Sequence, residues 1–131
     1  MENLKKLGAD GENIACLYLE SKGYETVKKN YRAKNRCEID IIVKKDEYIV
    51  FIEVKTRTSS SFGVPSESVN IAKQKNIIAA ARYFLNESGN LYSKSQPRFD
   101  VIEIYKDNKT GKNYVRNIEN AFIVNEKNRK K

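Results

Sequence analysis

Four charged side chains in the central segment have the types and spacing of a metal-binding patch. Glu38 and Asp40 are two residues apart in one apolar run, and Glu53 and Lys55 are two residues apart in the next. Residues two apart on a β-strand point to the same face of a sheet, so each pair is expected to share a face. Carboxylates set among Ile and Val side chains destabilise a fold unless a cation compensates their charge, and a divalent metal ion is the commonest such cation.

The connection between the two runs decides whether the two pairs meet. Residues 37–43 and 48–55 are predicted strands, and the connection between them is short enough for a hairpin. Residues directly opposite each other in an antiparallel pair share a face, so any turn with an even number of residues brings the pairs together. A two-residue turn places Asp40 opposite Glu53, and a four-residue turn places Glu38 there instead. An odd turn or a bulge separates the pairs.

The other elements follow from periodicity and from turn residues. A helix is predicted over 3–22 with Gly23 as its C-terminal cap, and a second helix runs from Ser66 or Ser68 to about Asn86. The stripe of this second helix that we expect to be buried consists of Val69, Ile77, Ala81 and Phe84. Three further strands are predicted at 24–32, 98–105 and 113–118. The order of helix, three strands, helix and two strands predicts an α/β fold with a mixed central sheet flanked by helices.

Glu12 is the acidic residue of the first helix that could reach the sheet. It lies at the edge of the apolar stripe, beside small residues such as Gly11 and Ala15, which let a helix approach a sheet closely. Either Asn3 or Asp10 could cap the start of this helix. We therefore expect Glu12 at the surface of the sheet, although a carboxylate near a helix start could also serve the helix dipole alone.

Length and composition set limits on the class of protein. A chain of 131 residues is long enough for one domain with its own core. It has no apolar run of bilayer length and no charged-then-apolar leader, so we expect a cytoplasmic protein without a membrane partner. The absence of histidine excludes Ser-His-Asp hydrolases and His-ligated metal enzymes. Cys16 and Cys37 are too few for a zinc site and are expected to be small apolar residues.

The charge balance favours a polyanion as partner. Lys and Arg total 25 against 17 Asp and Glu, which gives a formal net charge of +8 and a pI near 9.4. A small basic protein most often meets nucleic acid, although solubility alone is the alternative reading. Residues 126–131 carry four basic side chains and one glutamate, and we expect them to form a disordered basic tail.

Several segments together resemble a known family. The helical Glu, the Asp of the second strand and the Glu-x-Lys of the third resemble the restriction-endonuclease-like PD-(D/E)xK superfamily. Over nearly the whole chain the sequence looks like the YraN family of small bacterial proteins, which is similar to archaeal Holliday-junction resolvases. The segments that carry this likeness are Gly11-Glu12, Glu38-Ile39-Asp40, Phe51 to Lys55, Phe62-Gly63 and Arg98-Phe99-Asp100. The resemblance implies a single domain over 1–125 with a restriction-endonuclease-like α-β-β-β-α-β core.

Two departures from the superfamily pattern stand out. Ile39 precedes Asp40 where the superfamily has proline, and Gln74 is followed by Ile78 where some members have a Gln-x-x-x-Tyr helix motif. Lys73 or Lys75 could take the role of that motif.

The resemblance also implies a site and a chemistry. Asp40 and Glu53 would bind Mg²⁺ or Mn²⁺ with the carbonyl of Val54, and Glu12 would coordinate directly or through water. Lys55 would orient the attacking water, help to deprotonate it and stabilise charge at phosphorus. Hard divalent cations prefer oxygen ligands, and a sparse carboxylate set leaves room for a substrate phosphate. A metal ion and a lysine together address the charge that grows in a phosphodiester transition state.

The roles of the remaining charged residues stay open. Glu38 could be an outer ligand of the site or a surface charge, and Arg98 and Asp100 are expected to form a structural pair. The candidates for phosphate contacts are Arg32, Arg57, Lys73 and Lys75.

The leading hypothesis is a Mg²⁺-dependent endonuclease that hydrolyses phosphodiester bonds in DNA, with branched or structured DNA favoured over RNA. The likeness to resolvases points to a homodimer, because two symmetric cuts need two sites. The alternative is a nucleic-acid-binding module of nuclease fold without robust hydrolysis. A third reading is a structural protein in which the carboxylates and the lysine form a buried ion network.

Overall fold

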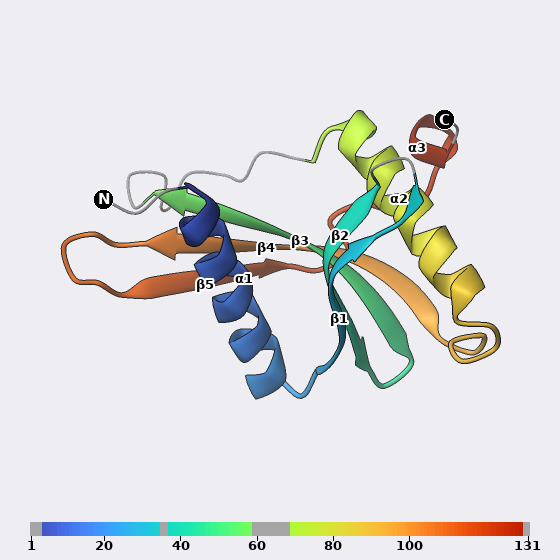
Figure 1. The fold of residues 1–131 in the computed structure, drawn as a ribbon, viewed down its shortest axis with the longest axis horizontal. Helices are drawn as coiled ribbons and strands as arrows, with labels where there is room; N and C mark the ends of the chain where they lie inside the picture. Colours follow the sequence, from blue (N-terminus) through green and yellow to red (C-terminus); the bar gives the residue numbers. More distant parts are fainter. Residues whose placement is uncertain (1–3, 35–36, 59–68, 130–131) are drawn as a thin grey trace.

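The computed structural model describes residues 4–34, 37–58 and 69–129, which form one five-stranded sheet with helices on both faces (Figure 1). In chain order the elements are α1 (Leu4–Ser21), β1 (Glu25–Arg32), β2 (Glu38–Lys45), β3 (Tyr48–Thr58), α2 (Ile71–Glu87), β4 (Gln96–Lys106), β5 (Asn113–Ile118) and α3 (Glu126–Arg129). The predicted α/β class and the predicted order of the main elements are confirmed.

The sheet is mixed because one connection crosses over a face. Its strands follow the order β1-β2-β3-β4-β5, and all neighbours are antiparallel except β3 and β4. Parallel neighbours need a crossover, which α2 provides. Buried side chains therefore form one cluster between the sheet and each long helix. The α1 cluster is Ala15, Cys16, Leu19, Ile41, Val43, Val50, Ile52, Ile102 and Ile104. The α2 cluster includes Ile39, Ile42, Ile49, Phe51, Ile77, Ala81, Phe84, Phe99 and Val101.

The start of α2 differs from the prediction. Its N-cap is Asn70, whose side-chain oxygen accepts a hydrogen bond from the Lys73 N–H at 2.8 Å. Asparagine caps helices as well as serine does, and it needs only the right position before the first turn. The proposed caps Ser66 and Ser68 precede this position and lie outside the described residues. All four residues of the predicted stripe are buried.

The end of α1 and its contact with the sheet follow the prediction. Gly23 has a φ of 91°, and its N–H donates to the Glu20 carbonyl, so this glycine ends the helix in a left-handed conformation. Asp10 lies within α1 and does not cap it, and Asn3 lies outside the described ranges. Gly11 faces β3 so closely that a Cβ built on it would lie 2.4 Å from Thr56 Oγ1.

This contact makes Gly11→Ala a test of the helix–sheet approach. In an open helix the change would stabilise by about 0.5–1 kcal/mol, because alanine loses less backbone entropy on folding. Here we expect it to destabilise by about 1–3 kcal/mol, because the stiff Thr56 side chain cannot move away freely. Urea unfolding measures the change. The control is Thr56→Ala, on whose background Gly11→Ala should become neutral or stabilising. A stabilising Gly11→Ala in the wild-type background would contradict the close approach.

The C-terminal residues are more ordered than expected. Residues 126–129 form α3, and Asn128 is buried, with its side-chain amide donating to Gln74 Oε1 and to the Ile123 carbonyl at 2.8 Å each. A hydrophilic composition predicted disorder, but these hydrogen bonds fasten the segment to α2. The prediction of a disordered tail is therefore wrong for 126–129.

Two further findings concern cysteines and membranes. Cys16 and Cys37 are buried, in agreement with their prediction as small apolar residues. Among the described helices, none combines the length and the apolar character that a membrane crossing requires.

Candidate functional site

The hairpin between β2 and β3 has the even turn on which the site depends. Lys45 pairs with Tyr48, so the turn consists of Asp46 and Glu47 alone. Asp46 has a φ of 52°, a left-handed conformation that Asp adopts more readily than most residues. The last pair of this ladder joins Ile41 to Ile52. Asp40 and Glu53, the next residues on each strand, therefore follow at the same level.

The two strands part at this level. β3 continues to Thr58 and remains paired with β4 to its end, but beyond Ile52 it has no further register with β2. The next β3 N–H that faces β2, that of Val54, donates to the side chain of Asp40 and not to a backbone carbonyl of β2. The acceptor of this hydrogen bond is Asp40 Oδ2, at 2.8 Å. Asp40 thus stands at the opening between the strands.

A local change in β2 accompanies this opening. Ile39 packs in the α2 cluster and Ile41 in the α1 cluster, although residues two apart on a regular strand share a face. Asn30 on β1 lies opposite this point, between the paired residues Lys29 and Tyr31, and has a φ of 52°. The alternation of faces is therefore broken at Asp40.

Glu38, two residues before Asp40 on β2, pairs with a residue of β1. The Glu38 carboxylate lies 3.2 Å from Arg32 Nε, in a pair whose side chains are 48% and 82% exposed. Regular alternation, on which the expectation of a shared face for Glu38 and Asp40 was based, is interrupted here, but the charge of Glu38, like that of Asp40, raises the pKa of Glu12. The pairing of Arg32 with Glu38 is a solvent-exposed contact of low strength.

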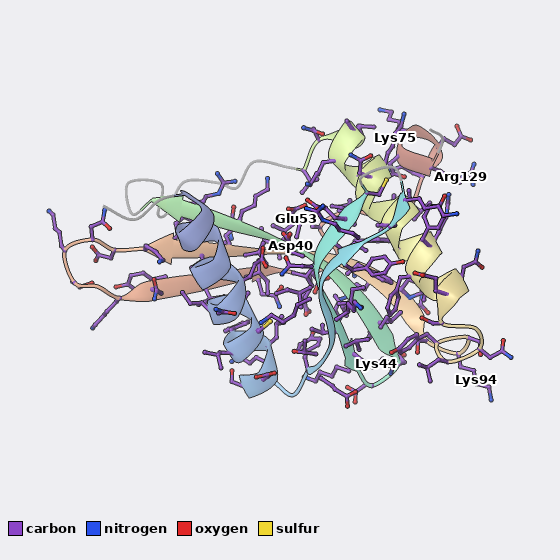
Figure 2. The ribbon with its side chains drawn as sticks, in the orientation of Figure 1. Asp40, Lys44, Glu53, Lys75, Lys94 and Arg129 are labelled. Carbon is purple, nitrogen blue, oxygen red and sulfur yellow. The ribbon has the colours of Figure 1, made fainter. Side chains whose placement is uncertain are left out.

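Glu53 carries the strongest electrostatic signal of the site. Its side chain is 14% exposed, and burial raises its pKa to about 7. The negative charge of Asp40 and a hydrogen bond with the Asp40 carboxyl contribute to this rise in pKa, whereas Lys73 opposes it. Figure 2 shows Asp40 and Glu53 next to each other at the centre of the sheet. The negative charge of Asp40 therefore makes ionisation of Glu53 less favourable, and a divalent cation bound between them would relieve this repulsion.

Two lysines approach Glu53 from different elements. Lys73 Nζ, from the first turn of α2, lies 3.4 Å from Glu53 Oε2. Lys55 is two residues beyond Glu53 on β3, so it shares the face of Glu53. Lys55 is half-buried and makes no hydrogen bond or ion pair with another residue of the described segments. Its ammonium group is thus available to a ligand.

Glu12 approaches from the opposite helix. Burial raises the pKa of its carboxyl, and the next largest cause is the negative charge of Asp40. A hydrogen bond with Asn30 and the charge of Lys29 act in the opposite direction. Asp40 is therefore the group that couples Glu12 on α1 to Glu53 on β3.

The donor set fits a hard divalent cation with few protein ligands. Asp40 and Glu53 supply carboxylate oxygens. In an extended strand the N–H and C=O of one residue leave on the same edge, so the Val54 carbonyl is expected to point into the same opening as its N–H. No three acidic or cysteine side chains within 4–34, 37–58 and 69–129 already converge as a metal-binding group. Mg²⁺ tolerates this arrangement, because it usually keeps several waters and takes one or two carboxylates.

Two other predicted phosphate-contact residues have surroundings of their own. Arg57 donates to the fully buried Glu103 at 2.8 Å, and Tyr105 also donates to Glu103. Arg57 is therefore bound to a carboxylate, and Lys75 is a half-buried residue of α2.

Arg98 and Asp100 form the structural pair that the sequence predicted. Arg98 donates to both carboxylate oxygens of Asp100, at 3.0 and 2.8 Å, and to the Tyr24 hydroxyl at 2.6 Å. Asp100 also accepts from the Asn120 N–H at 3.1 Å. The pair belongs to the buried framework and not to the acidic opening.

Sequence reasoning missed Asn30, Asn70 and Glu103. Asn30 and Asn70 act through backbone conformation and helix capping, and asparagine is common in both roles at many unrelated positions. Glu103 lies inside an apolar strand and is fully buried. The signal available in the sequence was a glutamate within an apolar run.

A mixed sheet covered on both faces, with an acidic pair where its central hairpin opens, defines an α/β protein with a candidate cation site at a strand opening. The chain belongs to the family described as "Uncharacterised protein family UPF0102", whose profile matches residues 11–104. This range contains all of the candidate site residues.

Curated relatives match over almost the full length. A UPF0102 protein of Caldicellulosiruptor bescii is 47% identical, covering 92% of this chain and 99% of its own. One of Caldanaerobacter subterraneus subsp. tengcongensis is 45% identical, over 92% and 97% of the two chains. One of Clostridioides difficile is 44% identical, over 92% and 99%.

Proposed function

We propose that this protein is an endonuclease that uses Mg²⁺ or Mn²⁺ to hydrolyse phosphodiester bonds in DNA, with branched or structured DNA as its substrate. The observation that carries the proposal is the coupled pair Asp40 and Glu53, set where β2 and β3 part, with Lys55 on the face of Glu53. A partly buried acidic pair, with a lysine on the same face of β3 that is unpaired among the described residues, is suited to bind a cation together with an anionic substrate.

Each residue has a role that its position supports. Asp40 and Glu53, with the Val54 carbonyl, would hold the cation, which when bound activates water and neutralises charge on the phosphate. Lys55 would orient the attacking water and stabilise the negative charge that develops at phosphorus. Glu12, coupled to Asp40, would hold a water of the metal from the α1 side.

Charge and resemblance support a nucleic-acid substrate. The net charge of +8 favours a polyanion. The likeness of the Glu, Asp and Glu-x-Lys pattern to the PD-(D/E)xK superfamily and to archaeal Holliday-junction resolvases favours DNA and a homodimer. A dimer would give two sites for two symmetric cuts.

A cleavage assay at low salt tests the function. Wild type and Lys55→Ala are incubated with labelled four-way junction, flap, single-stranded and duplex DNA and with RNA, in Mg²⁺, Mn²⁺ or EDTA. We expect metal-dependent cutting that falls at least about a hundredfold in Lys55→Ala while DNA binding persists. Lys94→Ala, in an exposed loop far from Asp40, is the matched control and should cut normally (Figure 2).

Two results would contradict the proposal. Binding without cutting by folded wild type would favour the nucleic-acid-binding module. Undiminished cutting by Lys55→Ala would show that this lysine has no role in catalysis.

A further inference from the structure

A hollow of about 480 Å³ lies between the end of β1 and the C-terminal half of α2. We call it the β1–α2 groove. Its volume is within the range of small-molecule sites in proteins. The residues of its lining that matter here are Tyr31, Arg32, Lys34, Tyr83, Asn86 and Glu87.

Tyr83 is the aromatic residue that borders this groove from α2. It also lines a second hollow of about 310 Å³ with Ala79, Arg82 and Asn86, so open space adjoins its half-exposed side chain on two sides. Within the described ranges its ring contacts no other aromatic ring. Tyr31, by contrast, packs edge-on against Phe84 at 5.4 Å between ring centroids. An aromatic ring left open in this way is a surface on which a nucleobase can stack.

The charges around Tyr83 are mainly positive. Arg32, Lys34 and Arg82 are exposed, and the one acidic residue of the lining, Glu87, accepts a hydrogen bond from the Tyr31 hydroxyl. Among the residues that the structure describes, the pair with Glu38 is the only ion pair of Arg32, and such exposed pairs contribute little to stability. Its guanidinium can therefore exchange that carboxylate for a phosphate.

The groove begins beside the acidic opening. Arg32 lies opposite Glu38 in the β1–β2 ladder, and Glu38 is two residues from Asp40. A nucleic-acid strand bound along the groove would thus lead toward Asp40 and Glu53.

We propose that the β1–α2 groove binds single-stranded nucleic acid, with a base stacked on Tyr83 and with Arg82, Arg32 and Lys34 contacting the phosphates. The combination of an open aromatic ring with flanking cations is the arrangement by which proteins hold single strands without reading sequence. The direction of the strand toward Asp40 rests on the proposed nuclease function, whereas binding in the groove requires neither metal nor cleavage.

Fluorescence anisotropy in EDTA tests the groove. The probes are labelled 15-residue oligo(dT), the RNA oligo(U) of equal length and a blunt DNA duplex. Tyr83→Ala should weaken binding of the single strands about tenfold and leave duplex binding unchanged, whereas Tyr83→Phe, which keeps the ring, should bind as wild type does. Tyr114→Ala, which removes an exposed tyrosine of β5 outside the groove, is the matched control.

Salt dependence tests the cations. Arg82→Ala should reduce the slope of log Kobs against log salt by about 0.7 for the single strands, since one phosphate contact is lost. Lys109→Ala removes the same charge from the exposed β4–β5 turn and should leave the slope unchanged. Photocrosslinking with 5-iodouracil in the oligonucleotide should label Tyr83.

The outcomes separate the groove from the nuclease. If Tyr83→Ala binds single strands with wild-type affinity, or loses equal affinity for single strands and duplex, single-strand binding in the groove is contradicted. This holds whether or not the protein cuts DNA. Tighter binding of either DNA or RNA single strands would support it and identify the preferred sugar. A protein that shows the Tyr83 effect but cuts no substrate would support binding in the β1–α2 groove and contradict the proposed nuclease function.

Discussion

Replacing Glu53 by glutamine is expected to stabilise the metal-free protein at pH 8, by up to about 3 kcal/mol. The folded protein holds the pKa of Glu53 at about 7, above the ordinary value of 4.5. Below pH 4.5 the carboxyl is protonated in both states and does not favour unfolding. Between pH 4.5 and 7 the unfolded chain releases this proton and the folded protein keeps it, so the stability falls as the pH rises. Glutamine is neutral at every pH and removes this loss.

Urea unfolding of wild type and Glu53→Gln at pH 5, 6, 7 and 8 measures the effect. The difference in unfolding free energy should be small at pH 5 and should grow to its full value above pH 7. Glu47→Gln, which makes the same change in the exposed hairpin turn, is the matched control. A Glu53→Gln protein that is less stable than wild type at pH 8 would show that the Lys73 contact outweighs burial and the charge of Asp40.

The same linkage predicts how metal acts on the protein. A cation at Asp40 and Glu53 must displace the proton of Glu53, so Mg²⁺ should stabilise wild type more at pH 8 than at pH 5. It should add little to Glu53→Gln. Equal effects of Mg²⁺ on the two proteins would place its binding elsewhere.

Arg98→Met is expected to cost about 3–5 kcal/mol of folding stability, because it leaves the Asp100 carboxylate buried without its cation. The two side chains are 9% and 1% exposed, and Asp100 would keep only the Asn120 N–H as a donor among the contacts described above. Arg98 also lies over the rings of Tyr24 and Tyr48, so its loss removes packing as well as charge.

The exposed pair offers a control with the same substitution. Arg32→Met removes the partner of Glu38 in a solvent-exposed pair and should change stability by less than about 1 kcal/mol. Chemical unfolding at neutral pH compares the two variants. Similar losses in both would mean that burial does not govern the strength of these pairs.

The central hairpin could be predicted from sequence because its evidence is local. Two apolar runs around the polar residues 44–47 indicate two strands, and the even parity of the turn puts Asp40 at the level of Glu53. The buried stripe of α2 was also predictable, since a helix repeats every 3.6 residues whatever packs against it.

The geometry of the opening itself could not be predicted in this way. The break in alternation at Asp40 lies opposite the left-handed backbone of Asn30, which belongs to the neighbouring strand. Lys73 reaches Glu53 only because the crossover brings the first turn of α2 over the end of β3. Such contacts join residues distant in sequence, and their partners leave no periodic pattern.

The docking of α3 changes how the basic end of the chain meets a polyanion. Asn128 fastens this helix to Gln74, so Lys127 and Arg129 are exposed on an ordered element beside α2. A flexible basic tail loses conformational entropy when it settles on a polyanion. Charges that the fold already holds in position avoid that loss, so this end of the molecule is preorganised for association.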